Sequence, residues 1–115
     1  ITWKNKVVSY ISDTEHFSDK LDKNVLELAK KTDIFIYDAM YTDEEYNNPN
    51  APKIGWGHST WQEAVKIAKA SKTKKLVIFH HDPIHDDKKM DEISKLVKKA
   101  YPKSITAKEG LKIII

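Results

Sequence analysis

The residues of this chain that could do chemistry stand where apolar stretches end. Three short apolar stretches read as buried strands, and the residues that follow them are Asp13, Asp38 and the adjacent pair His80 and His81. In a largely parallel sheet the carboxyl ends of neighbouring strands lie side by side, and ligands bind in the crevice there. We therefore expect these distant residues to share one site.

Asp13 is the first candidate for a metal ligand. It is followed by Thr14, Glu15 and His16, so several ligand-type groups occur within four residues. A divalent cation bridged by an aspartate would suit this arrangement. The alternative is that Asp13 and Thr14 only turn the chain and cap the next helix.

Asp38 and His58 are weaker signals when each is taken alone. A carboxylate at the end of a buried strand is costly unless it is paired or hydrogen-bonded. His58 lies between two small residues at the predicted start of a helix, where the macrodipole favours a neutral imidazole. Such a histidine can orient a substrate or exchange a proton, although many histidines at helix starts are only surface residues.

The segment FHHDPIHDD concentrates three histidines and three aspartates. Alternation along a strand sends His80 and His81 to opposite faces, so only one can point at the common site, and we take His80 as the metal ligand. The other is expected to hydrogen-bond around the site. A local site made of His81, His85 and Asp86 is a lesser alternative, because Pro83 breaks helical spacing.

Amphipathic patterns predict three helices that alternate with strands at residues 7–12, 33–37 and 76–79. The first helix is capped by Asp22 or Asn24, and the second by a capping box that starts at Ser59 or Thr60. Each helix has one apolar face. The residues of these faces are Val25, Leu26, Leu28 and Ala29 in the first helix, Trp61, Ala64, Val65 and Ala68 in the second, and Met90, Ile93, Leu96 and Val97 in the third.

Two stretches remain outside these strands and helices. Residues 39–57 hold two prolines and two glycines, which predicts a long ordered loop of the kind that is usually functional. Residues 105–107 and 111–115 read as a closing hairpin. The sequence thus predicts an α/β half-sandwich.

Composition fits one soluble domain over residues 1–115, with 40% apolar and 32% charged residues. The absence of cysteine leaves histidine and carboxylate as metal ligands, and no stretch resembles a membrane span or signal peptide, so we expect a cytoplasmic protein. All 20 basic residues are lysines spread along the chain. Without arginine, bidentate recognition of phosphates is absent, and we do not expect nucleic-acid binding by this segment alone.

Four motifs together resemble a known family. VVSYISDTEH, IYDAMYTDEEY, GWGHSTWQEAV and KLVIFHHDP occur in the order and roughly the spacing of the carboxy-terminal half of metallo-β-lactamase fold hydrolases, in the branch of tRNase Z and related phosphodiesterases. The resemblance implies an α/β fold: the C-terminal αβ half of an αββα sandwich, with a mixed sheet and flanking helices. It also implies hydrolysis of a phosphodiester or related ester, assisted by two ions of zinc or another divalent metal.

The resemblance gives a role to each candidate residue. Asp13 would bridge the two metal ions, and His80 would be the last histidine ligand. Asp38 and His58 would contact phosphate or help to protonate the leaving group.

The family's His-x-His-x-Asp-His motif lies upstream of the bridging aspartate, and this chain does not contain it. We therefore expect part of a longer hydrolase, whose partner is the missing N-terminal half of the fold. The 115 residues alone are expected to be inactive, and their exposed apolar sheet surface favours a homo-oligomer. The expected substrate is a small molecule or phosphate ester.

Two other classes of function remain open from the sequence. One is a receiver-like signalling domain phosphorylated at Asp38, which the stretch TDIFIYDAMYTD resembles. The other is a non-catalytic interaction module, in which the histidine-rich loop is incidental.

Overall fold

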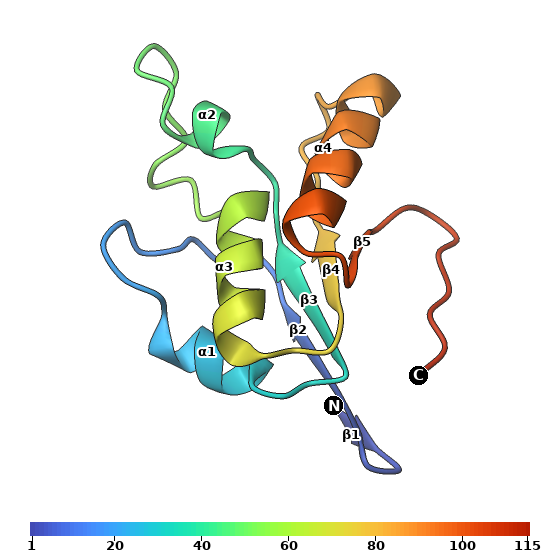
Figure 1. Cartoon of the computed structure of the whole chain (residues 1–115). Helices are drawn as coiled ribbons and strands as arrows, with labels where there is room; N and C mark the ends of the chain where they lie inside the picture. The colour runs from blue at the N-terminus through green and yellow to red at the C-terminus, as the bar shows by residue number, and fades with distance from the viewer.

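Five strands form one mixed sheet in the computed structural model, which describes residues 1–115 (Figure 1). They lie in sequence order across the sheet. β2 to β5 run parallel, and β1 pairs antiparallel with β2. Their bounds are Thr2–Trp3 for β1, Lys6–Ile11 for β2, Ile34–Asp38 for β3, Leu76–Phe79 for β4 and Ser104–Thr106 for β5.

Helices join each parallel strand to the next, as parallel pairing requires. Their bounds are Lys23–Ala29 for α1, Asp43–Tyr46 for α2, Trp61–Ser71 for α3 and Asp87–Ala100 for α4. The three predicted helices are confirmed. Each of these begins after a side chain that accepts hydrogen bonds from the first turn: Asp22, Thr60 and Asp86.

The two faces of the sheet are covered differently. Side chains alternate along β3 and β4, so that Phe35, Tyr37, Leu76 and Ile78 join the core under the helices. α1, α3 and α4 all lie on this face, and the opposite face carries no helix (Figure 1). The predicted α/β half-sandwich is therefore correct.

The core contains thirteen buried residues: Val25, Ala29, Phe35, Tyr37, Ala39, Ala64, Val65, Ile67, Ala68, Leu76, Ile78, Ile93 and Val97. Five residues predicted on apolar helix faces are outside it. Leu26, Trp61 and Met90 are partly buried and pack against the core, whereas Leu28 is 60% and Leu96 52% exposed. α1 is only two turns long and buries Val25 and Ala29, so the neighbouring Leu28 points away from the sheet.

α2 lies inside the stretch predicted to be a loop. Thr42 accepts a hydrogen bond from the backbone N–H of Glu45 at 3.2 Å, and the Glu45 carboxylate accepts one from the backbone N–H of Thr42 at 2.9 Å. This is the capping box of the sequence T-D-E-E. The signal was present, but the prolines and glycines that follow it dominated the prediction.

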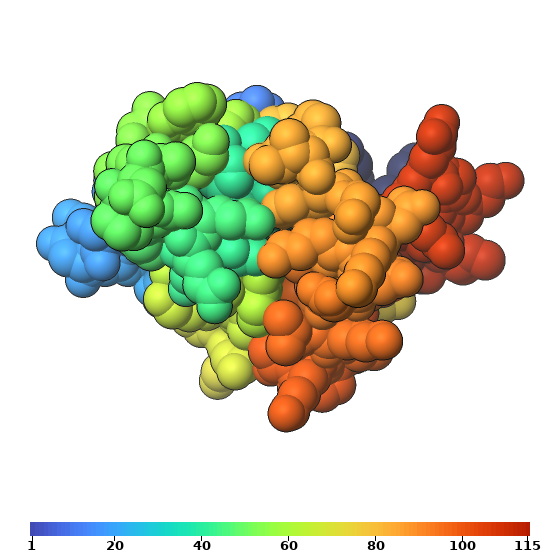
Figure 2. Space-filling view, turned by 90° about the horizontal axis from the view of Figure 1, so that it is seen from above, coloured from blue at the N-terminus to red at the C-terminus, as the bar shows by residue number.

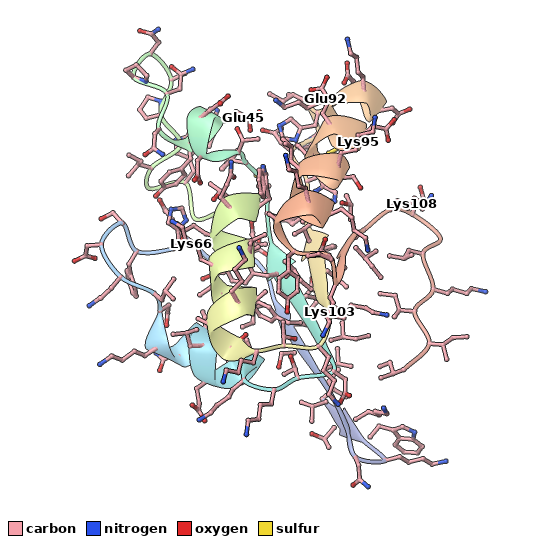
Figure 3. All side chains as sticks on the ribbon, viewed as in Figure 1. Glu45, Lys66, Glu92, Lys95, Lys103 and Lys108 are labelled. Atoms are coloured by element: carbon pink, nitrogen blue, oxygen red, sulfur yellow. The ribbon has the colours of Figure 1, made fainter.

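The capping box predicted at the start of α3 is only half formed. Thr60 accepts from the backbone N–H of Glu63 at 3.2 Å, but the Glu63 side chain pairs with Lys66 at 2.5 Å, along α3 (Figure 3). The Thr60 hydroxyl donates to Asp43 at 2.6 Å and so connects α3 to α2. The Thr60 hydroxyl therefore caps α3 and also makes this tertiary contact.

The predicted closing hairpin is wrong. Ser104–Thr106 pairs parallel with β4 as an edge strand after the α4 crossover, and residues 111–115 belong to no strand. The last segment instead leaves β5 and returns along the side of the molecule (Figure 1). None of the helices has the length and apolar character that a bilayer crossing needs.

Candidate metal centre at the carboxyl end of the sheet

Asp13, His58 and His80 come together at the carboxyl ends of the parallel strands. One ligand atom from each lies within 4.8 Å of the others. Asp13 follows β2 by two residues, His80 follows β4 directly, and His58 lies two residues before the N-cap of α3. The convergence expected from strand order is therefore present.

Asp38 contacts all three residues of this cluster through hydrogen bonds. It is the last residue of β3 and is completely buried, with an exposure of 0%. Its Oδ2 accepts from the backbone N–H of Asp13 at 2.9 Å and lies 2.9 Å from Nδ1 of His58 and 3.2 Å from Nδ1 of His80. Its Oδ1 accepts from the backbone N–H groups of Ser59 at 3.2 Å and Met40 at 3.3 Å. Five donors offset the cost of burying the charge.

This arrangement fixes the state of both imidazoles. An ionised carboxylate can only accept, so Nδ1 of His58 and of His80 must each carry the proton that faces Asp38. Nε2 of each ring is then left for a metal ion or a substrate. A carboxylate behind a histidine is the usual way of orienting a metal ligand and raising its basicity.

The helix dipole contributes less to His58 than the sequence suggested. α3 begins at Trp61, and the field of a helix end falls off within one turn. The carboxylate of Asp38 at 2.9 Å is the dominant neighbour.

Asp13 and His80 share an unusual backbone conformation. Their φ angles are 52° and 63°, in the left-handed region that residues other than glycine seldom adopt. Such residues cluster at functional sites, where the surrounding structure holds them. Here the turn after each strand aims the side chain into the cluster.

His80 and His81 point to different sides, as alternation predicted. His80 contacts Asp38, whereas Nε2 of His81 donates to the carbonyl of Ala107 at 3.1 Å. Burial lowers the pKa of His81, which favours the neutral ring. His81 thus connects β4 to the C-terminal segment.

The alternative local site made of His81, His85 and Asp86 does not form. Nε2 of His85 contacts Glu45 at 2.8 Å, and Asp86 caps α4 through the backbone N–H of Lys89 at 2.8 Å. Glu45 lies on α2, which faces this loop (Figure 3). Each residue of the proposed trio has a different partner.

Glu15 and His16 do not join Asp13 as ligands. The Glu15 carboxylate accepts from the Tyr46 hydroxyl at 2.5 Å and from the backbone N–H groups of Gly55 at 2.7 Å and Gly57 at 3.0 Å. We call this set of contacts the Glu15 clasp. Sequence reasoning missed it, because nothing in the spacing of these residues signals a contact across 40 positions.

The clasp also affects ionisation. Partial burial pushes the pKa of Glu15 up, but the bonds from Tyr46, Gly55 and Gly57 outweigh it and leave the pKa below its usual value. Burial and the neighbouring Glu15 raise the pKa of Tyr46, which therefore remains a donor. The clasp fixes the loop before His58 against the loop after Asp13.

Comparison with known proteins now identifies the family. Residues 1–81 match the family model described as "Beta-lactamase superfamily domain". The chain belongs to this superfamily. This membership argues against the receiver-like alternative, in which Asp38 would be phosphorylated, and Asp38 is completely buried.

Ribonuclease Z proteins are among the relatives of this superfamily member. That of Saccharolobus solfataricus is 34% identical over 83 residues, which are 72% of this chain and 26% of that protein. That of Pyrococcus horikoshii is 33% identical over 85 residues, 74% of this chain and 24% of that protein. The chain thus spans about a quarter of the length of these relatives.

Solved structures confirm the metallo-β-lactamase fold. The metallo-beta-lactamase fold protein YhfI from Bacillus subtilis superposes with a TM-score of 0.68 at 19% identity, over 92% of this chain and 38% of that one. A diphosphatase from the PhnP family gives a TM-score of 0.66 at 20% identity, over 96% and 36%. The predicted mixed α/β sheet with flanking helices is confirmed.

The residues present fit part of the metal site that this fold implies. One carboxylate and two imidazoles are ligand types that zinc takes, and catalytic zinc uses three protein ligands. Nε2 of both histidines is available, because Nδ1 of each ring carries the proton that faces Asp38. The three groups would suffice for one ion only with His58 as a ligand, and they do not suffice for two ions.

Proposed function

We propose that this chain supplies part of the active site of a divalent-metal-dependent hydrolase of phosphodiesters. The observation that carries the proposal is the cluster of Asp13, His58 and His80 around the buried Asp38. Membership in the superfamily and the ribonuclease Z relatives support the substrate class. Zinc is our first candidate ion, because the ligands are histidine and carboxylate.

In this proposal Asp13 and His80 hold the metal. A bound divalent ion would supply an activated water and neutralise negative charge that develops on the phosphate. Asp38 keeps Nδ1 of His80 protonated and so keeps Nε2 free as the ligand atom. The left-handed backbone at both ligands holds their side chains toward one point.

His58 is proposed to move the proton. Its Nδ1–H is bound to Asp38, so proton exchange takes place at Nε2. The carboxylate stabilises the ring when Nε2 is protonated, which lets His58 give that proton to the leaving oxygen. Because Asp38 is completely buried, its part is to orient the two histidines and the backbone of Asp13.

The site requires further ligands from another stretch of polypeptide. The helix-free face of the sheet borders a cavity of about 570 Å³, and its lining includes Tyr10, Ile36, Val77 and Phe79. We propose that residues 1–115 form one folding unit, and that the remainder of the fold covers this face and completes the metal site. Alone, the unit would be inactive.

The test is hydrolysis of bis(p-nitrophenyl) phosphate by the full-length protein with zinc or manganese added. We expect metal-dependent turnover, which Asp13→Asn reduces at least about a hundredfold because the anionic ligand is lost. Asp91→Asn, an exposed site on α4, is the matched control. Equal turnover in Asp13→Asn and the unaltered chain would contradict the proposal, and an absence of metal binding would favour the interaction-module alternative.

A further inference from the structure

Trp56 is held out into solvent by the loop that leads to His58. Its exposure is 62%, although an indole of this size usually packs against the protein. The residues on either side, Gly55 and Gly57, have φ angles of 85° and 86° and donate their N–H groups to the same Glu15 carboxylate. The backbone is therefore fixed on both sides of the exposed ring.

A cation accompanies this ring. Nζ of Lys53 lies 4.3 Å from the centroid of Trp56 and 5.9 Å from that of Tyr41. Tyr41 in turn contacts His58 edge-on, with 6.3 Å between ring centroids. The tryptophan, the lysine and the candidate proton carrier thus follow one another through neighbouring contacts.

The backbone that carries Trp56 lies next to the metal centre. Trp56 precedes His58 by two residues, so their Cα atoms are at most about 7 Å apart. Its partner Glu15 follows Asp13 by two residues. Seen from above, the segment 39–58 and the segment 80–100 lie on either side of this end of the sheet (Figure 2).

We propose that Trp56 and Lys53 form a binding subsite for the nucleobase and an adjoining phosphate of a nucleotide phosphodiester. The inference rests on the proposed function and narrows its substrate class to nucleotides. Every base has a π-face that stacks on an exposed aromatic ring, and stacking needs no arginine. A lysine beside the ring adds a point charge for phosphate.

The chain contains a matched control for this subsite. Trp3 is 69% exposed and has Nζ of Lys4 at 5.5 Å from its ring. It lies on β1, at the amino end of β2 and away from the metal centre (Figure 1). A loss of nucleotide binding that follows substitution of Trp56 and not of Trp3 therefore depends on the position of Trp56 beside the metal centre.

The experiment titrates the full-length chain with adenosine monophosphate and, separately, with ribose 5-phosphate. The NMR signals of the indole N–H groups report binding without any turnover. We expect the nucleotide to bind at least about fivefold more tightly than the sugar phosphate, the lower limit for one stacked base, and to shift the Trp56 signal. Trp56→Ala should abolish this difference, Trp56→Phe should retain part of it, and Trp3→Ala should leave it unchanged.

Equal affinities for the two ligands, or a difference that survives Trp56→Ala, would overturn the subsite. Lys53→Gln should lower the affinity for both ligands by the same factor. Unchanged affinity for ribose 5-phosphate would overturn the assignment of Lys53 to phosphate binding. Because binding is read without hydrolysis, a failure here is distinct from a failure of the phosphodiesterase assay.

Discussion

Asp38 determines the geometry of the candidate centre although it does not face solvent. It connects the loop after β2, the loop before α3 and the residue after β4 through one carboxylate. Its two oxygens thus hold all three segments that carry the cluster. Its removal should therefore affect both stability and metal binding.

We predict that Asp38→Asn destabilises the fold by about 3 kcal/mol. The amide keeps the shape but loses the charge, and its NH₂ group must face backbone or ring N–H donors. Urea unfolding measures the change, with Asp91→Asn expected within about 0.5 kcal/mol of the unaltered chain. A loss below about 1 kcal/mol for Asp38→Asn would show that the five contacts contribute little.

Loops and helices set the position of His58 through the Glu15 clasp. The clasp joins the segment after β2 to the segment between α2 and α3, and the Thr60–Asp43 bond joins α3 to α2. These contacts turn a stretch rich in glycine and proline into a fixed loop. The position of His58 therefore depends on these loop and helix contacts as much as on the ends of the strands.

The pH dependence of the clasp follows from the lowered pKa of Glu15. A carboxyl whose pKa is lower in the folded state stabilises that state above its ordinary pKa of 4.5, and the contribution is lost as pH falls through the folded value. We predict that Gly55 and Gly57 amides are protected from hydrogen exchange at pH 6 and lose that protection in strong acid.

Glu15→Gln should expose both amides to exchange already at pH 6, since a neutral amide is a weaker acceptor. Glu44→Gln, on the exposed side of α2, is the control and should leave protection unchanged. Equal protection in Glu15→Gln and the unaltered chain would mean that the loop is held by other contacts.

How much of this could be predicted from sequence depends on the range of the interactions. Asp13, Asp38 and His80 were predicted to meet because strand order in a parallel sheet places them together. The Glu15 clasp was not predicted, since it depends on how the loop before His58 turns at two glycines. The closing hairpin was wrong because β5 pairs with β4 instead, a choice that local pattern does not reveal.

The whole molecule has one covered and one open sheet face. The open face presents Tyr10, which is 56% exposed, beside Phe79 at a ring separation of 5.5 Å. Apolar surface of this kind marks an interface. Leu111 and Ile113 of the C-terminal segment line the cavity on this face together with Ile36 and Val77.

We predict that residues 1–115 self-associate through this face when the rest of the fold is not supplied. Tyr10→Lys should weaken association about tenfold, because it buries a charge in the contact. Leu28→Lys, on the exposed side of α1, should have no effect. Sedimentation at several concentrations measures both, and a monomer at all concentrations would contradict the prediction.

The most direct measurement follows the imidazole nitrogens of His58 and His80 by ¹⁵N NMR while zinc is added. We predict that Nδ1 of both rings is protonated and that zinc shifts Nε2 of His80, with Nε2 of His58 left free. Zinc that leaves His80 unchanged, or that binds at Nδ1 in place of Asp38, would contradict the proposed centre.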